Sequence, residues 1–317
     1  MNQFFKQVTS KIQNYQSIYI MTHKNMDLDG FGAALGMSNI LKKYNKKANI
    51  IVNSNKQESA MKKAIELAQK KHYFFIESNA IDELPENSLL ILLDVHKKEM
   101  LEIPSLTEKA KEIIILDHHI KRECTESNLS FLEPTVSSTV EIVVNYLIEE
   151  KLSIDSVTAT IMLAGIYIDT NSFNVKTTDK TFEVAAYLMM NKADNVLKQE
   201  LFQEDKKAII RRQKLLKNSY KVNENMMICT LDKNIYKTSD LAKVAEEILQ
   251  FQNVEASFAI GYIDKNEVGI SARSLGKIDV EKIMKKLGGG GHKTDAATKI
   301  ENGSISKTKE LLENILR

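Results

Sequence analysis

The stretch SIYIMTHKNMDLDGFGAALG, residues 17–36, decides the fold class of this chain. It begins with a short run of β-branched and aromatic residues (17–21), passes through a polar segment, and enters a stretch with helical periodicity (30–43). A continuous apolar run of this length is typical of a strand buried in a parallel sheet. A buried strand that is followed at once by a helix predicts the opening of an α/β fold.

The same pattern recurs along the first half of the chain. Residues 89–93 (LLILL) and 112–116 (EIIIL) are two further apolar runs. Stretches with helical periodicity occupy residues 57–71 and 138–151. This alternation of strand-like and helix-like segments predicts an open α/β sheet.

Acidic residues and histidines follow the ends of these predicted strands. Ligands of open α/β sheets bind at the carboxyl edge, so motifs that are far apart in sequence are expected to converge there. A further aspartate follows the apolar stretch 160–168 and is expected at the same edge. The residues predicted to meet are His23, Asp27 and Asp29, then Asp94, then Asp117, His118 and His119, and finally Asp169.

This combination of side chains predicts a metal centre. Carboxylates with imidazoles suit Mn²⁺, Fe²⁺, Co²⁺ or Zn²⁺, and the absence of thiolates from the motifs argues against a structural zinc. Several carboxylates also allow one of them to bridge two ions about 3.5–4 Å apart, the arrangement used in phosphoryl transfer. Asp117 has a second interpretation, as a residue that orients a histidine ring. His96 has two as well: it faces the site, or it lies in a solvated loop.

Length and composition limit the remaining possibilities. With 317 residues, 43% of them apolar and 27% charged, the chain is predicted to form two soluble domains. The net charge of +2 gives no field strong enough to indicate binding of long nucleic acid. Cys124 and Cys229 are lone thiols, which predicts a reducing, cytoplasmic location. No run approaches the roughly 18 apolar residues of a membrane span, so no membrane partner is expected.

The second half of the chain predicts a helical connection and a smaller domain. Residues 179–221 have a helical pattern and many charges. Beyond them, the alternating stretches 226–231, 256–263 and 267–273 are typical of strands. Together with helix-like segments between them, these stretches predict a smaller α+β domain of about a hundred residues.

A run of four glycines (288–291) lies inside this smaller domain. In isolation such a run is typical of a flexible linker. Its position between a helical stretch and the segment AATKI instead favours a backbone that approaches a phosphate or a nucleobase closely. The residues predicted to face an anionic ligand here are Gly288, Gly289, Gly290, Gly291, His292 and Arg273.

A pair of serines precedes the helix predicted at 138–151. Ser138, followed three residues later by Glu141, matches a capping box, which is a sufficient structural reason for this serine. A helix N-terminus at the metal edge would also receive a phosphate. Ser137 and Ser138 are therefore candidates for substrate binding as well, and the two interpretations are compatible.

Together the motifs resemble the DHH/DHHA1 phosphoesterase superfamily. The segments HKNMDLDG, LLDVH, LDHH, GIYIDT and GGGGH carry this resemblance, which covers nearly the whole chain. Longer segments, among them HKNMDLDGFGAALG and GISARSLGKIDVEKIMKKLGGGGH, resemble the catalytic part of the GdpP-type cyclic di-AMP phosphodiesterases. The branch of oligoribonucleases and pAp phosphatases (NrnA type) shares the same skeleton.

The resemblance implies a chain in three parts. Residues 1–190 would form a DHH domain, a doubly wound parallel sheet that carries the metal site. Residues 191–221 would form a helical linker, and residues 222–317 a smaller α+β DHHA1 domain that binds the substrate. The family resemblance also favours a homodimer.

The resemblance assigns roles to the site residues. His23 and Asp27 would hold one Mn²⁺ ion, and Asp94 would bridge it to a second; other divalent transition metals suit the same ligands. His119 would contact the scissile phosphate and act in catalysis with Asp94 and His118. The remaining roles are Asp29, His118 and Asp169 as ligands of the second ion, Arg273, Gly288 to Gly291 and His292 on the substrate-binding surface, and Ser137 and Ser138 on the facing side.

The predicted function is hydrolysis of cyclic di-AMP to linear pApA by a hydroxide that two metal ions activate. The first alternative is NrnA-like hydrolysis of very short oligoribonucleotides or of pAp. A second alternative, from another class of protein, is a nucleotide sensor whose metal site is inactive; against it, every ligand position holds a competent residue. The complete metal set also argues against an RNA-binding accessory module.

Overall fold

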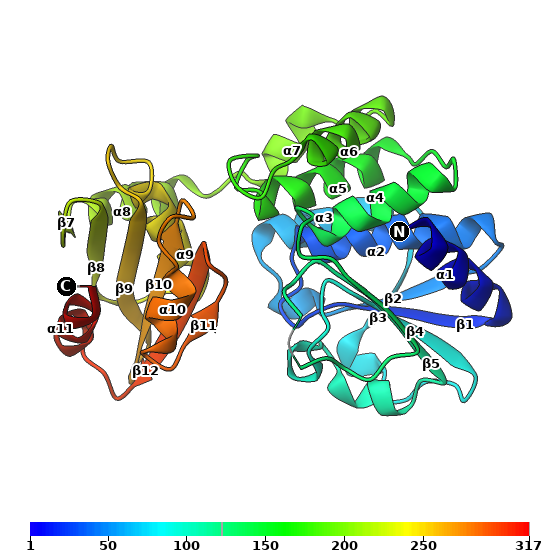
Figure 1. The fold of residues 1–317 in the computed structure, drawn as a ribbon, viewed down its shortest axis with the longest axis horizontal. Helices are drawn as coiled ribbons and strands as arrows, with labels where there is room; N and C mark the ends of the chain where they lie inside the picture. The colour runs from blue at the N-terminus through cyan, green and yellow to red at the C-terminus, as the bar shows by residue number, and fades with distance from the viewer. Residues whose placement is uncertain (122, 317) are drawn as a thin grey trace. The chain divides into compact units, whose positions relative to one another are not determined.

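The computed structural model describes residues 1–121 and 123–316 and divides into two compact units, Met1–Gln203 and Glu204–Arg317 (Figure 1). Each unit has its own six-stranded sheet and its own hydrophobic cores. Among the helices of the described residues, none has the length and apolar character that crossing a lipid bilayer requires.

The first unit is built on a sheet whose neighbouring strands are all parallel. The strand order is β3-β2-β1-β4-β5-β6, so the chain winds outward from β1 to β3, returns to β4 beside β1, and winds outward the other way. This is a doubly wound order, and the predicted fold class is confirmed. The strands are β1 (Ser17–Met21), β2 (Ala48–Val52), β3 (Phe74–Glu77), β4 (Ser88–Leu93), β5 (Glu112–Asp117) and β6 (Leu129–Leu132).

Three of these strands, β2, β3 and β6, were not among the sequence predictions. β3 and β6 are the edge strands of the sheet, and they have no fully buried residue. β2 is the neighbour of β3 and is only five residues long. Edge strands are not enclosed on both faces, so β3 and β6 lack the long apolar run that marks β4 and β5. β2 is buried at four of its five positions, but the polar Asn49 interrupts its apolar run.

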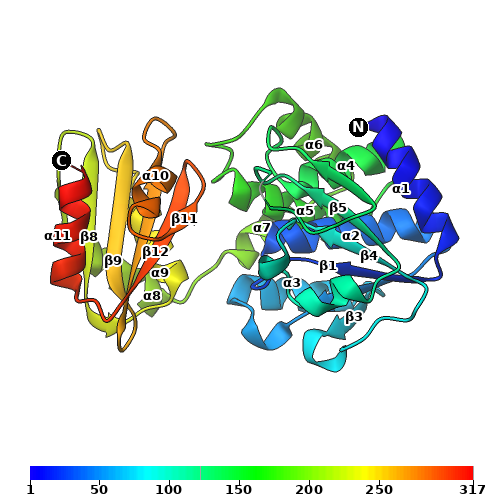
Figure 2. The ribbon, with the colours of Figure 1, turned by 60° about the horizontal axis from the view of Figure 1, so that its bottom comes forward.

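The helices of the first unit gather on one face of its sheet (Figures 1 and 2). Alternate residues of β4 divide between the two faces: Ile91 packs into the helical core, whereas Leu90 and Leu92 pack beneath the sheet, where loops and 3₁₀ turns cover them. The helices are α1 (Asn2–Asn14), α2 (Leu28–Lys43), α3 (Ser59–Gln69), α4 (Thr139–Glu149), α5 (Ser156–Asp169), α6 (Asp179–Met190) and α7 (Asn195–Leu201), and the 3₁₀ turns are η1 (Ser54–Lys56), η2 (Ser78–Ala80), η3 (Lys98–Met100) and η4 (Pro104–Glu108).

Helices α2 and α5 approach each other closely at the carboxyl edge of the sheet. A Cβ atom on Gly165 of α5 would lie 2.7 Å from the carbonyl oxygen of Leu28 and 2.8 Å from the Cα atom of Asp29. Only glycine permits this approach. Because α5 ends one turn later at Asp169, the contact brings the first turn of α2 close to the end of α5.

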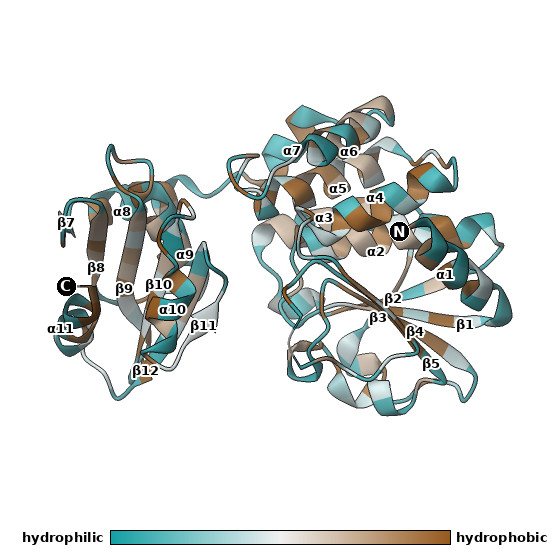
Figure 3. Ribbon diagram, viewed as in Figure 1, coloured by the Kyte–Doolittle hydropathy of each residue, from teal (hydrophilic) through white to brown (hydrophobic). Residues whose placement is uncertain are grey.

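The second unit is a mixed sheet in the order β11-β12-β10-β9-β8-β7, in which only the described pair β8 and β9 is parallel. Leu215 and Val244 pack on one face, and Met284 and Leu312 pack on the other. Figure 3 shows the hydrophobic character of β8 and β9, the strands at the middle of this packing. The elements are α8 (Lys206–Leu216), β7 (Ser219–Lys221), β8 (Met226–Ile235), α9 (Thr238–Ile248), β9 (Ala256–Asp264), β10 (Glu267–Ser274), α10 (Val280–Lys285), β11 (Gly290–Gly291), β12 (Asp295–Glu301) and α11 (Ile305–Leu316).

The predicted smaller α+β domain is thus confirmed as a fold. The residues predicted to form a helical linker (191–221) include α7, which belongs to the first unit, and α8 and β7, which belong to the second. The assignment of separate functions to the parts 1–190, 191–221 and 222–317 stays a prediction.

Candidate metal centre

The carboxyl ends of β1, β4 and β5 and the end of α5 bring the acidic and imidazole side chains together. They form three overlapping groups, which we call donor groups because each residue offers one potential metal-ligand atom. Within each donor group these atoms lie within 4.8 Å of one another. One group is His23, Asp27 and Asp94; the second is Asp29, His118 and Asp169; the third is Asp94, His118 and His119.

The loop between β1 and α2 presents three of these residues. Asp27 caps α2, and its Oδ1 accepts hydrogen bonds from the backbone N–H groups of Asp29 (2.9 Å) and Gly30 (3.1 Å). Capping fixes one oxygen of Asp27 at the helix N-terminus. The Nε2 atom of His23 lies 3.8 Å from that same oxygen, so the histidine and the cap face each other.

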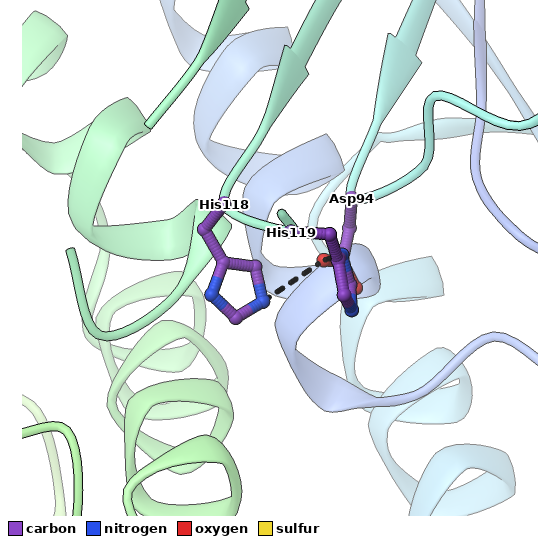
Figure 4. Close-up of side chains that lie close together, drawn as sticks. All are labelled: Asp94, His118 and His119. Atoms are coloured by element: carbon purple, nitrogen blue, oxygen red, sulfur yellow. Dashed lines mark ion pairs between the residues drawn. The ribbon is translucent and has the colours of Figure 1, made fainter. Parts of the chain in front are cut away.

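Asp94 lies at the centre of the site, directly after β4. Its backbone has a φ of +61°, a left-handed conformation that costs a non-glycine residue of order 1–3 kcal/mol and occurs most often at functional sites. Oδ2 lies 3.4 Å from Nε2 of His23. Oδ1 lies 3.4 Å from Nε2 of His118, the pair that Figure 4 shows. One carboxylate therefore offers an oxygen to each of two donor groups.

Asp117, the last residue of β5, orients two histidine rings. Its Oδ1 is 2.7 Å from Nδ1 of His119, and its Oδ2 is 2.5 Å from Nδ1 of His96. Asp117 is fully buried, whereas the His119 side chain is 32% exposed and so remains accessible to a substrate. The orienting role proposed for Asp117 matches this geometry. His96 is buried, so the interpretation of a solvated loop histidine is wrong.

Asp169 completes the group around His118. It is the last residue of α5, and its Oδ2 lies 3.1 Å from Nε2 of His118. The carboxylate of Asp29 lies in the same donor group and is fully buried. The site therefore draws its side chains from four elements that are far apart in sequence.

The buried groups shift one another's pKa values. Burial, and then the charge of Asp169, raises the pKa of Asp29 well above its ordinary value. Burial acts in the same direction on Asp94, but hydrogen bonds from His118 and His23 outweigh it and hold the pKa of Asp94 well below its ordinary value. Burial alone would lower the pKa of His23, yet its bonds to Asp27 and Asp94 raise it well above that of free histidine.

This donor set fits divalent cations. Ligands of one ion, each about 2 Å from it, lie up to about 4 Å apart, so small movements of the side chains suffice for coordination. Burial, together with the charges of Asp169 and Asp94, raises the pKa of Asp29, and bound cations would offset both effects. The acidic and histidine clusters could therefore hold metal. The sequence-predicted ligands all lie in these groups, and their individual roles stay proposals.

The two serines predicted to bind substrate have buried side chains with structural partners. Ser138 caps α4, and its Oγ accepts from the backbone N–H of Glu141 at 3.1 Å. The capping box is only half formed, because the carboxylate of Glu141 accepts from Ser137 Oγ (2.5 Å) and from Thr181 Oγ1 (3.0 Å). A contact of Ser137 or Ser138 with substrate stays a prediction.

The remaining predicted site residues lie in the second unit. The guanidinium of Arg273 donates from Nε to Glu246 (3.0 Å) and from Nη1 to the carbonyl of Ala272 (3.0 Å). Gly290 and Gly291 form β11 and pair with β12. The glycine run is thus part of the sheet, not a flexible linker. His292 follows, and its backbone N–H donates to the carbonyl of Asp295 at 2.6 Å.

The roles of two residues at the site could not be derived from the sequence. His96 carried a signal, since it follows Asp94 by two residues, but burial could not be inferred from that spacing. Thr139 belongs to the same helix start as Ser137 and Ser138, but its contact with Asp94 could not be inferred from the sequence. Its hydroxyl donates to Asp94 Oδ1 at 3.0 Å.

Family models match both units. The model for the DHH family, N-terminal domain, matches residues 17–166, and the model for the DHHA1 domain matches residues 223–317. The chain therefore carries a DHH domain followed by a DHHA1 domain.

Known proteins of similar sequence or fold agree with this placement. Cyclic-di-AMP phosphodiesterase GdpP of Bacillus subtilis is 34% identical over 98% of this chain, and the chain spans about half (48%) of its length. Bifunctional oligoribonuclease and PAP phosphatase NrnA of Mycoplasma genitalium is 27% identical over 92% of this chain and 91% of its own. An exopolyphosphatase-related protein from Bacteroides fragilis shares the fold, with a TM-score of 0.86, 19% identity, and coverage of 100% of this chain and 96% of that one.

Proposed function

We propose that this chain is a metal-dependent phosphodiesterase that opens cyclic di-AMP to linear pApA. The observation that carries the reaction type is Asp94, whose two oxygens face two separate donor groups at the carboxyl edge of the sheet. The similarity to GdpP over almost the whole chain supports the cyclic dinucleotide as substrate.

The donor groups suggest how metal ions would be held. His23 and Asp27 would hold one ion, Asp29, His118 and Asp169 would hold the other, and Asp94 would contact both. Mn²⁺ is the ion we propose, because mixed carboxylate and imidazole ligands suit it. When bound, such cations supply positive charge that stabilises the phosphoryl oxygens and acidifies a water molecule.

His119 is the residue we assign to the substrate phosphate. Asp117 holds the Nδ1 side of the ring, so the opposite edge has a fixed direction. Burial lowers the pKa of His119, but the bond to Asp117 outweighs it and raises that pKa above the ordinary value. A higher pKa favours a protonated ring, which can donate a hydrogen bond to a phosphate oxygen.

The second unit would bind the nucleotide. Arg273, Gly288 to Gly291 and His292 are the residues we propose for this role. Glu246 fixes Nε of Arg273, which leaves the guanidinium in a defined orientation at the sheet. Ser137 and Ser138, just before α4, are proposed for the facing side of the binding surface, where both side chains are buried.

A second candidate is hydrolysis of very short oligoribonucleotides or of pAp. It is supported by the similarity to NrnA of Mycoplasma genitalium, which is 27% identical over 92% of this chain. Both candidates use the same donor groups, so the site does not distinguish between them. A homodimer stays a prediction in either case.

The test is an assay with four substrates. Purified protein with Mn²⁺ is incubated separately with cyclic di-AMP, cyclic di-GMP, pApA and pAp, and the products are identified by mass. We expect cyclic di-AMP to give pApA. Asp94→Ala should lower the rate about a thousandfold or more, because several kcal/mol of charge stabilisation are lost. The matched control is Asp82→Ala, an exposed aspartate of the same unit, which should leave the rate unchanged.

Two results would contradict the proposal. Rapid release of phosphate from pAp with inert cyclic di-AMP would reverse the ranking of the two substrates. A near-normal rate in Asp94→Ala, with metal still bound, would refute the assignment of the site itself.

A further inference from the structure

We propose that Thr139 is a positioning residue that holds two carboxylates of the metal centre in their relative orientation. This inference rests on the proposed role of Asp94 and Asp29 as metal ligands. Thr139 is fully buried and donates to both of them: its hydroxyl to Asp94 Oδ1 at 3.0 Å, and its backbone N–H to Asp29 Oδ2 at 2.8 Å. No other described residue is recorded donating hydrogen bonds to both of these carboxylates.

The N-terminus of α4 is fully engaged by Asp29. The backbone N–H groups of Thr139 and Val140 donate to the two oxygens of this carboxylate, each at 2.8 Å. A carboxylate is stabilised there by the partial positive charge of the helix N-terminus. These two donors are therefore not available to a substrate phosphate, and their role is to fix the direction of Asp29.

The hydroxyl of Thr139 fixes the other carboxylate. The oxygens of Asp94 face different donor groups, Oδ1 toward His118 and Oδ2 toward His23. Rotation of the carboxylate would misalign both oxygens at once. A hydrogen bond to Oδ1 from a fully buried donor opposes that rotation, as supporting residues around metal sites commonly do.

Other buried threonines in this unit show what a merely structural hydroxyl does. Thr160 and Thr170 are also fully buried, and their hydroxyls donate to the backbone carbonyls of Ser156 and Ile166, four residues earlier in α5. This is the usual bond of a threonine inside a helix. Thr139 is the first residue of α4, and its hydroxyl donates across the sheet edge to Asp94.

The geometry thus joins three elements at one residue. Asp94 follows β4, Asp29 lies in the first turn of α2, and Thr139 begins α4. Thr139 is 45 residues from Asp94 and 110 residues from Asp29 in the sequence, so both hydrogen bonds depend on the assembled fold. Loss of the hydroxyl is expected to weaken metal binding while the backbone contact to Asp29 persists.

The test measures binding of Mn²⁺ alone, without nucleotide, by calorimetric titration of the full chain. Thr139→Val removes the hydroxyl and keeps the shape, and Thr139→Ser keeps the hydroxyl. The matched control is Thr160→Val, which removes a buried hydroxyl of the same unit that contacts no candidate ligand. Thermal unfolding in the presence of a chelator checks that each variant folds.

We expect Thr139→Val to weaken Mn²⁺ binding about tenfold or more, in the range reported for supporting residues of metal sites. Thr139→Ser should bind within about twofold of the wild type, and Thr160→Val should bind as the wild type does. Wild-type affinity in folded Thr139→Val would overturn the inference. A tenfold loss in Thr139→Ser would also overturn it, even if the valine variant does not fold. Because no nucleotide is present, an error in the proposed substrate does not affect these outcomes.

Discussion

Asp117 shows how a residue that binds no proposed ion can still determine a metal site. It is fully buried at the end of β5, and each of its oxygens accepts a hydrogen bond from a different histidine ring, His96 or His119. Burial raises the pKa of Asp117, but the bonds from His119 and His96 outweigh it and lower the pKa to about 2. The ionised form is therefore the one that the fold stabilises.

The first prediction concerns the pH dependence of Asp117→Asn. A depressed pKa contributes stability that is present above the ordinary value of 3.8 and is lost as the pH falls through about 2. At 1.36 kcal/mol per pKa unit, the substitution should lower the free energy of unfolding by about 2 kcal/mol at pH 7. The difference from the wild type should persist at pH 5 and shrink below pH 4.

The measurement is urea denaturation of both proteins in chelator at pH 7, 5 and 3. Asp82→Ala serves as the control for the loss of an exposed carboxylate. A stability difference that stays constant down to pH 3 would show that the ionised form of Asp117 is not the source of the effect.

At the residue scale, the sequence was informative about side chains with characteristic chemistry. The histidines and aspartates predicted to converge do so, because strand ends of a parallel sheet share an edge and the helix α5, which carries Asp169, ends there. Their partners could not be predicted in the same way. Thr139 and His96 act through burial and direction, which depend on how α4 and the loop after β4 pack.

At the scale of elements, periodicity identified three strands of the first sheet and missed β2 and the two edge strands. β1, β4 and β5 appeared as continuous apolar runs, and β4 is buried at all of its positions. β3 and β6 are partly exposed, so their short segments resemble loops. The missed strands do not carry candidate ligands, which explains why the site could be predicted although half of the sheet was not.

The glycine run, for which the sequence favoured contact with a ligand over a flexible linker, also has a role in packing. A Cβ on Gly289 would lie 2.2 Å from the carbonyl oxygen of Ala297 in β12, whereas a Cβ on Gly290 would meet nothing within 4 Å. Close packing of β11 on β12 thus requires some of the glycines. Others are free of this constraint and remain candidates for contact with a substrate.

The second prediction separates these two roles. Gly289→Ala should destabilise the second unit by about 1–3 kcal/mol, because the added methyl group collides with backbone. Gly290→Ala, the matched control one residue away, should leave stability nearly unchanged and instead raise KM if the run contacts the nucleotide. Thermal unfolding and steady-state kinetics measure the two effects. Equal destabilisation by both substitutions would contradict the packing argument, and an unchanged KM in Gly290→Ala would remove that glycine from the binding surface.

At the scale of the whole molecule, the candidate ligands belong to one unit only. Each described residue of the three donor groups, from His23 to Asp169, lies in Met1–Gln203. The second unit has separate cores on the two faces of its own sheet. An ion that binds the folded site stabilises the unit that forms it, because the unfolded chain cannot bring these ligands together.

The third prediction follows because the candidate ligands lie in the first unit and not in the second. Mn²⁺ at a hundred times its dissociation constant should stabilise the first unit by about 2.7 kcal/mol. Hydrogen exchange resolved by peptide should then slow by up to about a hundredfold in the most protected segments of α2, α4 and α5, since those amides exchange by opening the whole unit. Peptides from β8, β9 and β10 should exchange at the same rate with and without the ion.

The control is Asp94→Ala, in which the effect of Mn²⁺ on the first unit should largely disappear. Equal protection of both units would mean that the ion couples their stabilities, and undiminished protection in Asp94→Ala would place the ion away from the carboxylate that the two donor groups share.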